Sequence, residues 1–228
     1  MIIAIDGPSG SGKSTLGRML ATELKLLYID TGSMYRAVAL AVIESSTNAT
    51  DDVAVGSLAA KIDIDLEGDP ESLRVTLGGR DVTQAIRAEE VTQMSSIVSA
   101  IPAVRRAMVE RQREMGRRGA VLNGRDIGTV VFPDADVKFF LTADARERAQ
   151  RRFDEERVND AGADYAATLA DMTERDRRDS TRIDSPLKVA NDAIVINSTG
   201  MTIDQVLERM MRELRAKGEG RRAESSRQ

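Results

Sequence analysis

The chain has 228 residues and a formal net charge of −4, and it contains no cysteine and no histidine. The absence of both residue types excludes thiolate chemistry, cysteine-based zinc sites and a Ser-His-Asp hydrolase. With 41% hydrophobic and 31% charged residues, the composition is that of a globular protein with one sizeable core. Any catalysis must therefore use carboxylates, Lys, Arg, hydroxyls, backbone amides or a metal ion held by oxygen atoms.

The net acidity argues against a general nucleic-acid or membrane-surface binder, and the aromatic content of 3% argues against a base-stacking platform. No apolar run approaches the ~20 residues that span a bilayer. The first residues contain no basic segment followed by a cleavage site. We therefore expect a cytoplasmic monomer that acts on small molecules, without nucleic-acid or membrane partners.

The N-terminal segment alternates between strand and helix patterns. Met1–Asp6 is predicted to be a short buried strand because its central residues are all apolar, and Leu27–Asp30 is a second apolar strand. Between them lie a glycine-rich turn over Gly7–Gly12 and a segment with helical apolar spacing over Lys13–Leu26. A second helix is expected over Ser33–Ile43. This strand–helix–strand order is typical of a parallel sheet.

A different pattern follows. Apolar and polar residues alternate over Ile62–Leu66 and again over Leu73–Leu77, with a break at Gly68–Pro70 and an end at Gly78–Gly79. Strict alternation interrupted by turn residues predicts an antiparallel hairpin. We expect it to lie in an inserted subdomain over residues 60–91.

The second half of the chain returns to the parallel-sheet pattern. After a helix over Val104–Arg118, we expect three buried strands and a final helix at Ala120–Leu122, Val137–Leu141, Ala193–Ile196 and Ile203–Arg215. Residues 144–182 are rich in charges of both signs, which fits either a solvated helix pair or a mobile flap that bends over Asn159–Asp164. The polar tail, residues 217–228, is expected to be disordered.

The glycine-rich turn carries the strongest motif. Gly7–Ser14 reads GPSGSGKS and fits G-x-x-x-x-G-K-[S/T], placed after an apolar strand and at the start of a helix. Glycines let successive amides point at phosphate oxygens, and the helix N-terminus adds partial positive charge. Lys13 would reach the β- and γ-phosphates of a nucleoside triphosphate, and the Ser14 hydroxyl would bind Mg²⁺. The strand and helix on either side count against a chance turn.

Two further segments follow predicted strands. Asp30–Arg36 follows the second strand, which directs Arg36 toward the phosphate loop, because ligands bind at the carboxyl ends of parallel strands. Asn123–Thr129 follows the third strand, where Arg125 and Asp126 can present a phosphate clamp and an acceptor together. The alternatives are a helix N-cap in the first segment and a tight turn with a surface ion pair in the second.

A predicted helix carries a row of arginines. Arg175, Arg178 and Arg182 fall on one face, and Asp179 lies beside that face. Three arginines in a row repel one another unless an anion or a carboxylate joins them. The row is therefore a candidate anion site, or a face braced by its own carboxylates.

Several stretches together resemble the bacterial cytidylate kinases, which are nucleoside monophosphate kinases of the P-loop class. They read IDGPSGSGKST, IDTGSMYR, IPAVR, NGRDIGTVVFPDADVKFFL and ERDRRDSTR, and they extend over nearly the whole chain. The resemblance implies an α/β fold with a five-stranded parallel sheet flanked by helices. The kinase core would span residues 1–59 and 92–216, with a substrate-binding insertion containing the hairpin over 60–91 and a helical lid at about 146–166.

The activity implied by the resemblance is ATP-dependent phosphorylation of CMP and dCMP, with Mg²⁺ accompanying ATP. Catalysis would fall to Lys13, Arg36, Arg125 and Asp126. ATP would be held by Gly7, Pro8, Ser9, Gly10, Ser11, Gly12, Lys13, Ser14 and Thr15, with Arg151 and Arg157, and also Arg148 and Arg152, from the lid. The acceptor nucleotide would be held by Thr31, Arg36, Ser96, Arg105, Arg125, Asp126, Asp179 and Arg182.

Three alternatives remain open. A different small-molecule P-loop kinase, of the UMP or shikimate type, would share the loop. A nucleotide-dependent switch would often carry an Asn-Lys-x-Asp element to read guanine, and the chain has none. A nucleic-acid-associated ATPase fits poorly with the acidity and the scarce aromatic residues.

Overall fold

The computed structural model describes residues 1–158 and 162–225, with side chains described up to residue 218. A five-stranded sheet in the order β2-β6-β1-β7-β8 forms the centre, and each adjacent pair of strands is parallel. Its strands are β1 (Ile2–Asp6), β2 (Leu27–Asp30), β6 (Ala120–Gly124), β7 (Val137–Thr142) and β8 (Ile194–Asn197). The predicted α/β class and the five-stranded parallel sheet are confirmed.

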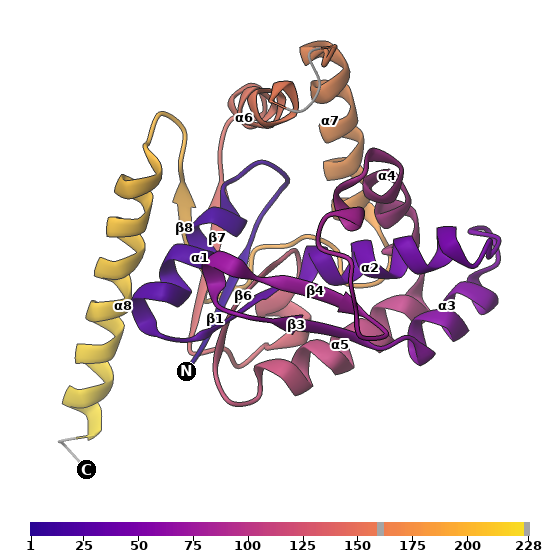
Figure 1. The fold of residues 1–228 in the computed structure, drawn as a ribbon. Helices are drawn as coiled ribbons and strands as arrows, with labels where there is room; N and C mark the ends of the chain where they lie inside the picture. Colours follow the sequence, from indigo (N-terminus) through magenta and orange to yellow (C-terminus); the bar gives the residue numbers. More distant parts are fainter. Residues whose placement is uncertain (159–161, 226–228) are drawn as a thin grey trace.

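Helices cover both faces of this sheet (Figure 1), and for that reason its strands are continuous apolar runs. Ile3 and Ile5 pack on one face with the helices α1 (Lys13–Leu24) and α8 (Ile203–Ser225). Ala4, between them, points to the opposite face, because successive side chains alternate along a strand. That face carries α2 (Thr31–Glu44), α3 (Asp52–Lys61), α4 (Glu89–Val98) and α5 (Pro102–Gly116).

The predicted hairpin is present. Strands β3 (Ile64–Glu67) and β4 (Arg74–Leu77) pair in antiparallel fashion, and a two-residue strand, β5 (Arg80–Asp81), extends them to a second sheet. The sequence pattern missed β5 because two residues show no periodicity. Leu66 and Val75 of this sheet belong to the same hydrophobic cluster as α2. The boundaries 60–91 of the insertion stay a prediction.

Helices α6 (Ala145–Arg157) and α7 (Tyr165–Thr181) rise together above the sheet (Figure 1). The rings of Phe153 and Tyr165 meet edge to face, with centroids 5.9 Å apart. The predicted bend over residues 159–164 begins outside the described residues, since 159–161 are not among them. Short helical turns complete the fold at η1 (Pro70–Ser72), η2 (Ala85–Arg87) and η3 (Ile127–Val131).

The C-terminal helix differs from the prediction. α8 continues to Ser225, well past Arg215, and 226–228 lie outside the described residues. The expected disorder of residues 217–228 stays a prediction. Within the described residues, no helix is both long and apolar enough to cross a membrane.

Candidate functional site

The phosphate loop connects the end of β1 to the start of α1. Gly10 and Gly12 have φ values of 69° and 85°, a region that favours glycine. The Lys13 ammonium donates to the Pro8 carbonyl oxygen at 2.5 Å and to Ser11 Oγ at 3.3 Å. Burial, together with the charges of Arg125 and Arg175, lowers the pKa of Lys13 well below its usual value. The amine is thus held against its own loop, next to other cations.

The carboxyl ends of β2 and β6 lie side by side, with Asp30 opposite Asn123. Asn123 Nδ2 donates to Ser14 Oγ at 3.2 Å and to Asp30 Oδ1 at 3.4 Å, which links the start of α1 to the end of β2. The Thr31 hydroxyl donates to the Asn123 carbonyl at 2.7 Å. Asp30 accepts from the Gly32 amide at 3.1 Å and so also caps α2. The N-cap interpretation is therefore confirmed.

Arg36 extends this edge from the first turns of α2. Its Nη2 donates to Ser33 Oγ at 2.8 Å and lies 3.5 Å from Asp30 Oδ2. Its Nε is buried without a hydrogen-bond partner. A positive group with an unused donor therefore lies at the carboxyl edge of the sheet.

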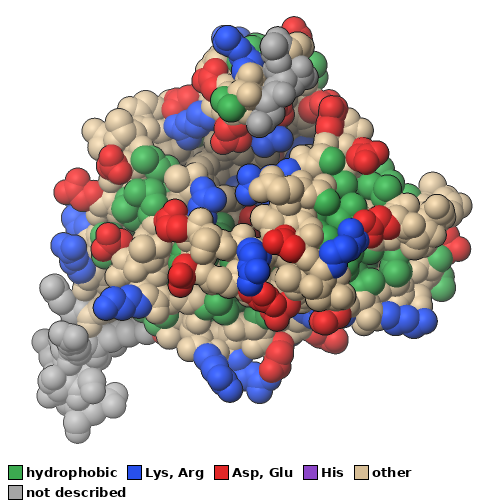
Figure 2. Space-filling view, in the orientation of Figure 1, with side chains coloured by type: hydrophobic (Ala, Val, Ile, Leu, Met, Phe, Trp, Pro, Cys, Tyr) green, Lys and Arg blue, Asp and Glu red, His purple; other side chains and the backbone are tan. Residues whose placement is uncertain are grey.

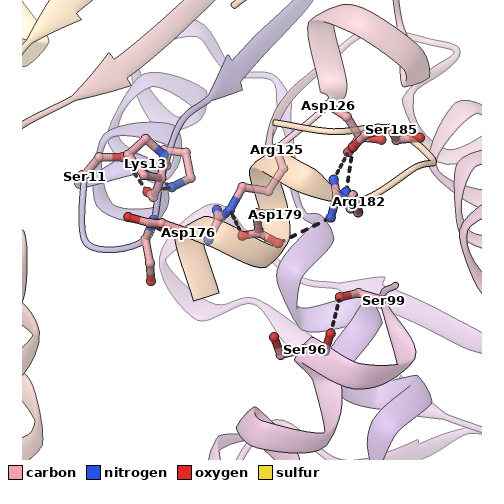
Figure 3. Close-up of polar contacts among 12 residues, drawn as sticks. Ser11, Lys13, Ser96, Ser99, Arg125, Asp126, Asp176, Asp179, Arg182 and Ser185 are labelled. Atoms are coloured by element: carbon pink, nitrogen blue, oxygen red, sulfur yellow. Dashed lines mark hydrogen bonds and ion pairs between the residues drawn. The ribbon is translucent and has the colours of Figure 1, made fainter. Parts of the chain in front are cut away.

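Arginines and carboxylates alternate across the centre of the site (Figure 3). Asp126 accepts from Arg105 Nη2 at 2.5 Å and lies 3.9 Å from Arg182 Nη2. Asp179 accepts from Arg125 Nε at 2.8 Å and from Arg182 Nη1 at 3.4 Å. Burial would raise the pKa of Asp179, but Arg125 and Arg182 outweigh it and lower that pKa. The two carboxylates therefore hold three guanidinium groups in one connected network.

This network leaves donors unused. Arg105 Nε and Arg182 Nη2 are buried and have no hydrogen-bond partner. Arg105 is only 2% exposed, donates to the Ser99 carbonyl at 3.1 Å and lies over the Tyr35 ring, 5.3 Å from its centroid. A buried N–H without an acceptor is costly, so these groups suit a ligand that supplies acceptors.

Arg175 belongs to the row of arginines that the sequence marks as a candidate anion site, although the resemblance gives it no specific role. It is partly buried, and its side chain forms no hydrogen bond or ion pair with any described residue. Burial and the nearby charge of Arg125 lower the pKa of Arg175 to about 10, and Arg36 and Arg152 add to this effect. Its spacing from Asp179 and Arg182, one and two turns along α7, was the available signal.

The arginines of α6 are distributed differently from the prediction. Arg148 Nη1 donates to the Ser9 carbonyl at 2.8 Å and to Asp176 Oδ2 at 2.7 Å, so it contacts the phosphate loop directly. Arg151 instead donates to the Ser198 carbonyl at 3.1 Å. Arg157 is exposed and lies over the Phe153 ring, 5.5 Å from its centroid. ATP binding by Arg151 and Arg157 stays a prediction.

Ser96 lies on α4, away from the arginines. Its carbonyl oxygen accepts from Ser99 Oγ at 3.3 Å, and it has no hydrogen bond to Arg105 or Arg182. Figure 3 shows Ser96 and Ser99 on a separate helix from Arg182. The structure therefore does not bring Ser96 into the network, and its role stays a prediction.

Figure 2 shows a hollow below the α6–α7 helices, with Lys and Arg side chains around it.

The parallel sheet in the order β2-β6-β1-β7-β8, with a G-x-x-x-x-G-K-S loop after its central strand and arginines around that loop, defines a P-loop kinase. The family model described as cytidylate kinase matches residues 3–216, and the chain belongs to this family.

Curated relatives agree with this assignment. The cytidylate kinase of Syntrophotalea carbinolica is 50% identical over 92% of this chain and 90% of its own length. That of Corynebacterium glutamicum is 47% identical and covers 96% of both chains. A solved structure of an uncharacterised protein from Eubacterium ventriosum has a TM-score of 0.52 at 15% identity, covering 93% of this chain and 97% of its own, and it shows the fold alone.

Proposed function

We propose that this protein transfers the γ-phosphoryl group of ATP to CMP and dCMP. The observation that carries the proposal is the network in which Asp126 and Asp179 hold Arg105, Arg125 and Arg182 beside the phosphate loop. Family membership supports the same activity. The network consists of guanidinium groups and carboxylates. Such groups suit phosphoryl transfer, because its catalysis depends on positioning and electrostatic stabilisation.

On the donor side, residues 7–15 would wrap the ATP phosphates. The Lys13 ammonium now bonds to Pro8 and Ser11, so it would exchange these loop contacts for the β- and γ-phosphate oxygens. The negative charge of those phosphates would raise the pKa of Lys13 toward its ordinary value, because an opposite charge favours the charged form. Binding of ATP and full protonation of Lys13 are therefore coupled.

The residues fit a Mg²⁺ ion that arrives with the nucleotide. No group of three or more acidic residues among the described residues could hold a metal by itself. Ser14 Oγ and the Asp30 carboxylate are both joined to Asn123, and they offer the oxygen atoms that Mg²⁺ prefers when phosphates supply most of its shell. When bound, the ion would neutralise phosphate charge.

On the acceptor side, the attacking group is already a phosphate anion at neutral pH. It needs no general base, which agrees with a chain that has no histidine. It needs cations that offset its repulsion from the γ-phosphate, and Arg36, Arg125 and Arg175 would supply them. The charge of Arg125 helps to lower the pKa of both Lys13 and Arg175, which indicates excess positive potential there that an anion would relieve.

The base would be recognised by the unused donors. Cytosine presents acceptors at N3 and O2, whereas uracil presents an N–H at position 3. Arginine can only donate, so Arg105 Nε and Arg182 Nη2 match cytosine and conflict with uracil. Ser96 would complete recognition by accepting from the cytosine N4 amine. The predicted lid, at about residues 146–166, would exclude water, since water would otherwise hydrolyse ATP.

The test is a coupled assay with ATP against CMP, dCMP, UMP, AMP and shikimate. We expect CMP and dCMP to be the preferred acceptors. Preferred phosphorylation of UMP or shikimate, or ATP hydrolysis without transfer, would contradict the proposal and favour the respective alternatives. The expectations of a monomer without nucleic-acid partners stay predictions, which light scattering and a DNA-binding titration would measure.

A further inference from the structure

The carboxylate of Asp6, the last residue of β1, joins two segments that lie far apart in sequence. Oδ1 accepts from the Ile127 amide at 2.8 Å, and Oδ2 accepts from the Gly128 amide at 2.7 Å. The side chain is 4% exposed, and the next residue, Gly7, begins the phosphate loop. Asp6 thus connects the donor loop to the turn that follows β6.

These two amides open the helical turn η3, where amides lack partners inside the turn. The residue in the usual capping position is Asp126, and its side chain makes no cap hydrogen bond. Its carboxylate is instead bonded to Arg105 and lies close to Arg182. Asp6 therefore performs the capping from a neighbouring strand, which leaves Asp126 free to hold the arginines.

Among the described residues, only these two amides donate a hydrogen bond to the Asp6 carboxylate, and its charge also acts on Lys13. Both carboxylate oxygens are used by the two amides, and Asp6 forms no ion pair with Lys13, whose ammonium is bonded to Pro8 and Ser11. Burial raises the pKa of Asp6 to about 6, although the two amides act in the opposite direction. Burial of a carboxylate costs free energy. The position that the Asp6 carboxylate gives to the Ile127 and Gly128 amides best explains why it is buried here.

Close packing surrounds both ends of this link. A Cβ on Gly7 would lie 2.0 Å from the Leu141 carbonyl oxygen, and a Cβ on Gly128 would lie 3.0 Å from Lys138 Cδ. Gly7 therefore packs tightly against β7 in a contact that does not involve Asp6, whereas the Ile127 and Gly128 amides take the Asp6 carboxylate as their acceptor. A change at Asp6 would move the Arg125–Asp126 turn and leave the phosphate loop in place.

We propose that Asp6 is a positioning residue, which sets the distance between the acceptor clamp on the Arg125–Asp126 turn and the phosphate loop. The proposal rests on the CMP kinase activity proposed above. Asp6 does not touch either nucleotide in this account. It acts on the clamp through its hydrogen bonds with the Ile127 and Gly128 amides.

The test is Asp6→Asn, an isosteric change that keeps one acceptor and turns an N–H donor toward an amide. A misplacement of about 1 Å in an active site can cost a hundredfold. We expect kcat to fall about ten- to a hundredfold and the KM for CMP to rise several-fold. The Kd of ATP, measured by calorimetry, should change less than about twofold, because Gly7 is held separately.

The matched control is Asp136→Asn. Asp136 Oδ2 accepts from the Ile2 amide at 2.7 Å, so it holds the opposite end of the same strand, away from the site. Its variant should keep wild-type kinetics. If Asp6→Asn behaves like this control, with altered melting temperature and normal kinetics, Asp6 is structural and the proposal fails. Equal loss of ATP and CMP affinity would overturn it as well.

If circular dichroism shows that Asp6→Asn is unfolded, Asp6→Glu is tested instead, because it keeps the charge and is one methylene longer. Asp6→Glu should likewise lower kcat and leave the Kd of ATP nearly unchanged. Normal kinetics in Asp6→Glu, or loss of folding in both variants, would refute the positioning role. A wild-type protein without CMP kinase activity would refute the proposed function, whereas an active wild type with unchanged variants would refute only this inference.

Discussion

The substitution Arg182→Met should narrow the preference for CMP over UMP. The Arg182 side chain is 8% exposed, its Nε donates to the Ser185 carbonyl at 2.6 Å, and its Nη2 has no hydrogen-bond partner. The methionine side chain is unbranched and long, like that of arginine, but it has no hydrogen-bond donor. Asp126 and Asp179 keep Arg105 and Arg125 as partners at 2.5 and 2.8 Å, so the network should remain paired after the change.

The magnitude follows from one buried hydrogen bond. An unpaired or mismatched buried polar group costs about 1–3 kcal/mol, which is roughly ten- to a hundredfold in discrimination. We therefore expect kcat/KM for CMP to fall by that factor, while kcat/KM for UMP falls much less, because the conflict between Arg182 and the uracil N3–H is removed.

The assay measures kcat/KM for both acceptors on wild type, Arg182→Met and the control Arg177→Met. Arg177 lies on the same helix, is exposed and pairs with Glu174 at 2.7 Å, so the control repeats the chemical change away from the site. An equal loss for CMP and UMP, with an unchanged ratio, would mean that Arg182 only braces Asp179 and would refute the base-reading role.

Three further predictions follow from the same site. Lys13→Ala should lower turnover at least ~10²-fold with the fold intact, because the charge on the β- and γ-phosphates is lost; near-normal activity in a folded variant would refute the phosphate-loop assignment. Arg125→Ala should harm CMP kinetics far more than ATP affinity, and the reverse result in a calorimetric titration would place Arg125 on the donor side. Arg105→Met removes the 2.5 Å partner of the buried Asp126 carboxylate and should lower the free energy of unfolding by about 3–5 kcal/mol, measured with urea. An unchanged urea midpoint would show that Arg182 alone compensates the Asp126 charge.

The phosphate loop and the sheet could be predicted because their signals are local. The strand before Gly7, the glycine spacing and the helix after Lys13 all lie within one short segment, and they indicate one local structure. The placement of Arg36 and Arg125 at the carboxyl edge then follows from the geometry of βα units. The strand order β2-β6-β1-β7-β8 was not predicted, because it depends on contacts between distant segments. The hairpin was predictable for the same reason, since alternation is a local property.

The capping of η3 by Asp6 and the contact of Arg148 with Ser9 could not be predicted, because each joins residues that are more than a hundred positions apart. The sequence shows many arginines on α6, but only packing decides that Arg148 reaches the phosphate loop while Arg157 lies over Phe153.

The sequence by itself determined the fold class, the phosphate loop and the residue types available for chemistry. The tertiary structure decided which donors remain unpaired, because burial and charge at Arg175 and Arg182 depend on every element packed around them rather than on their place in the helix.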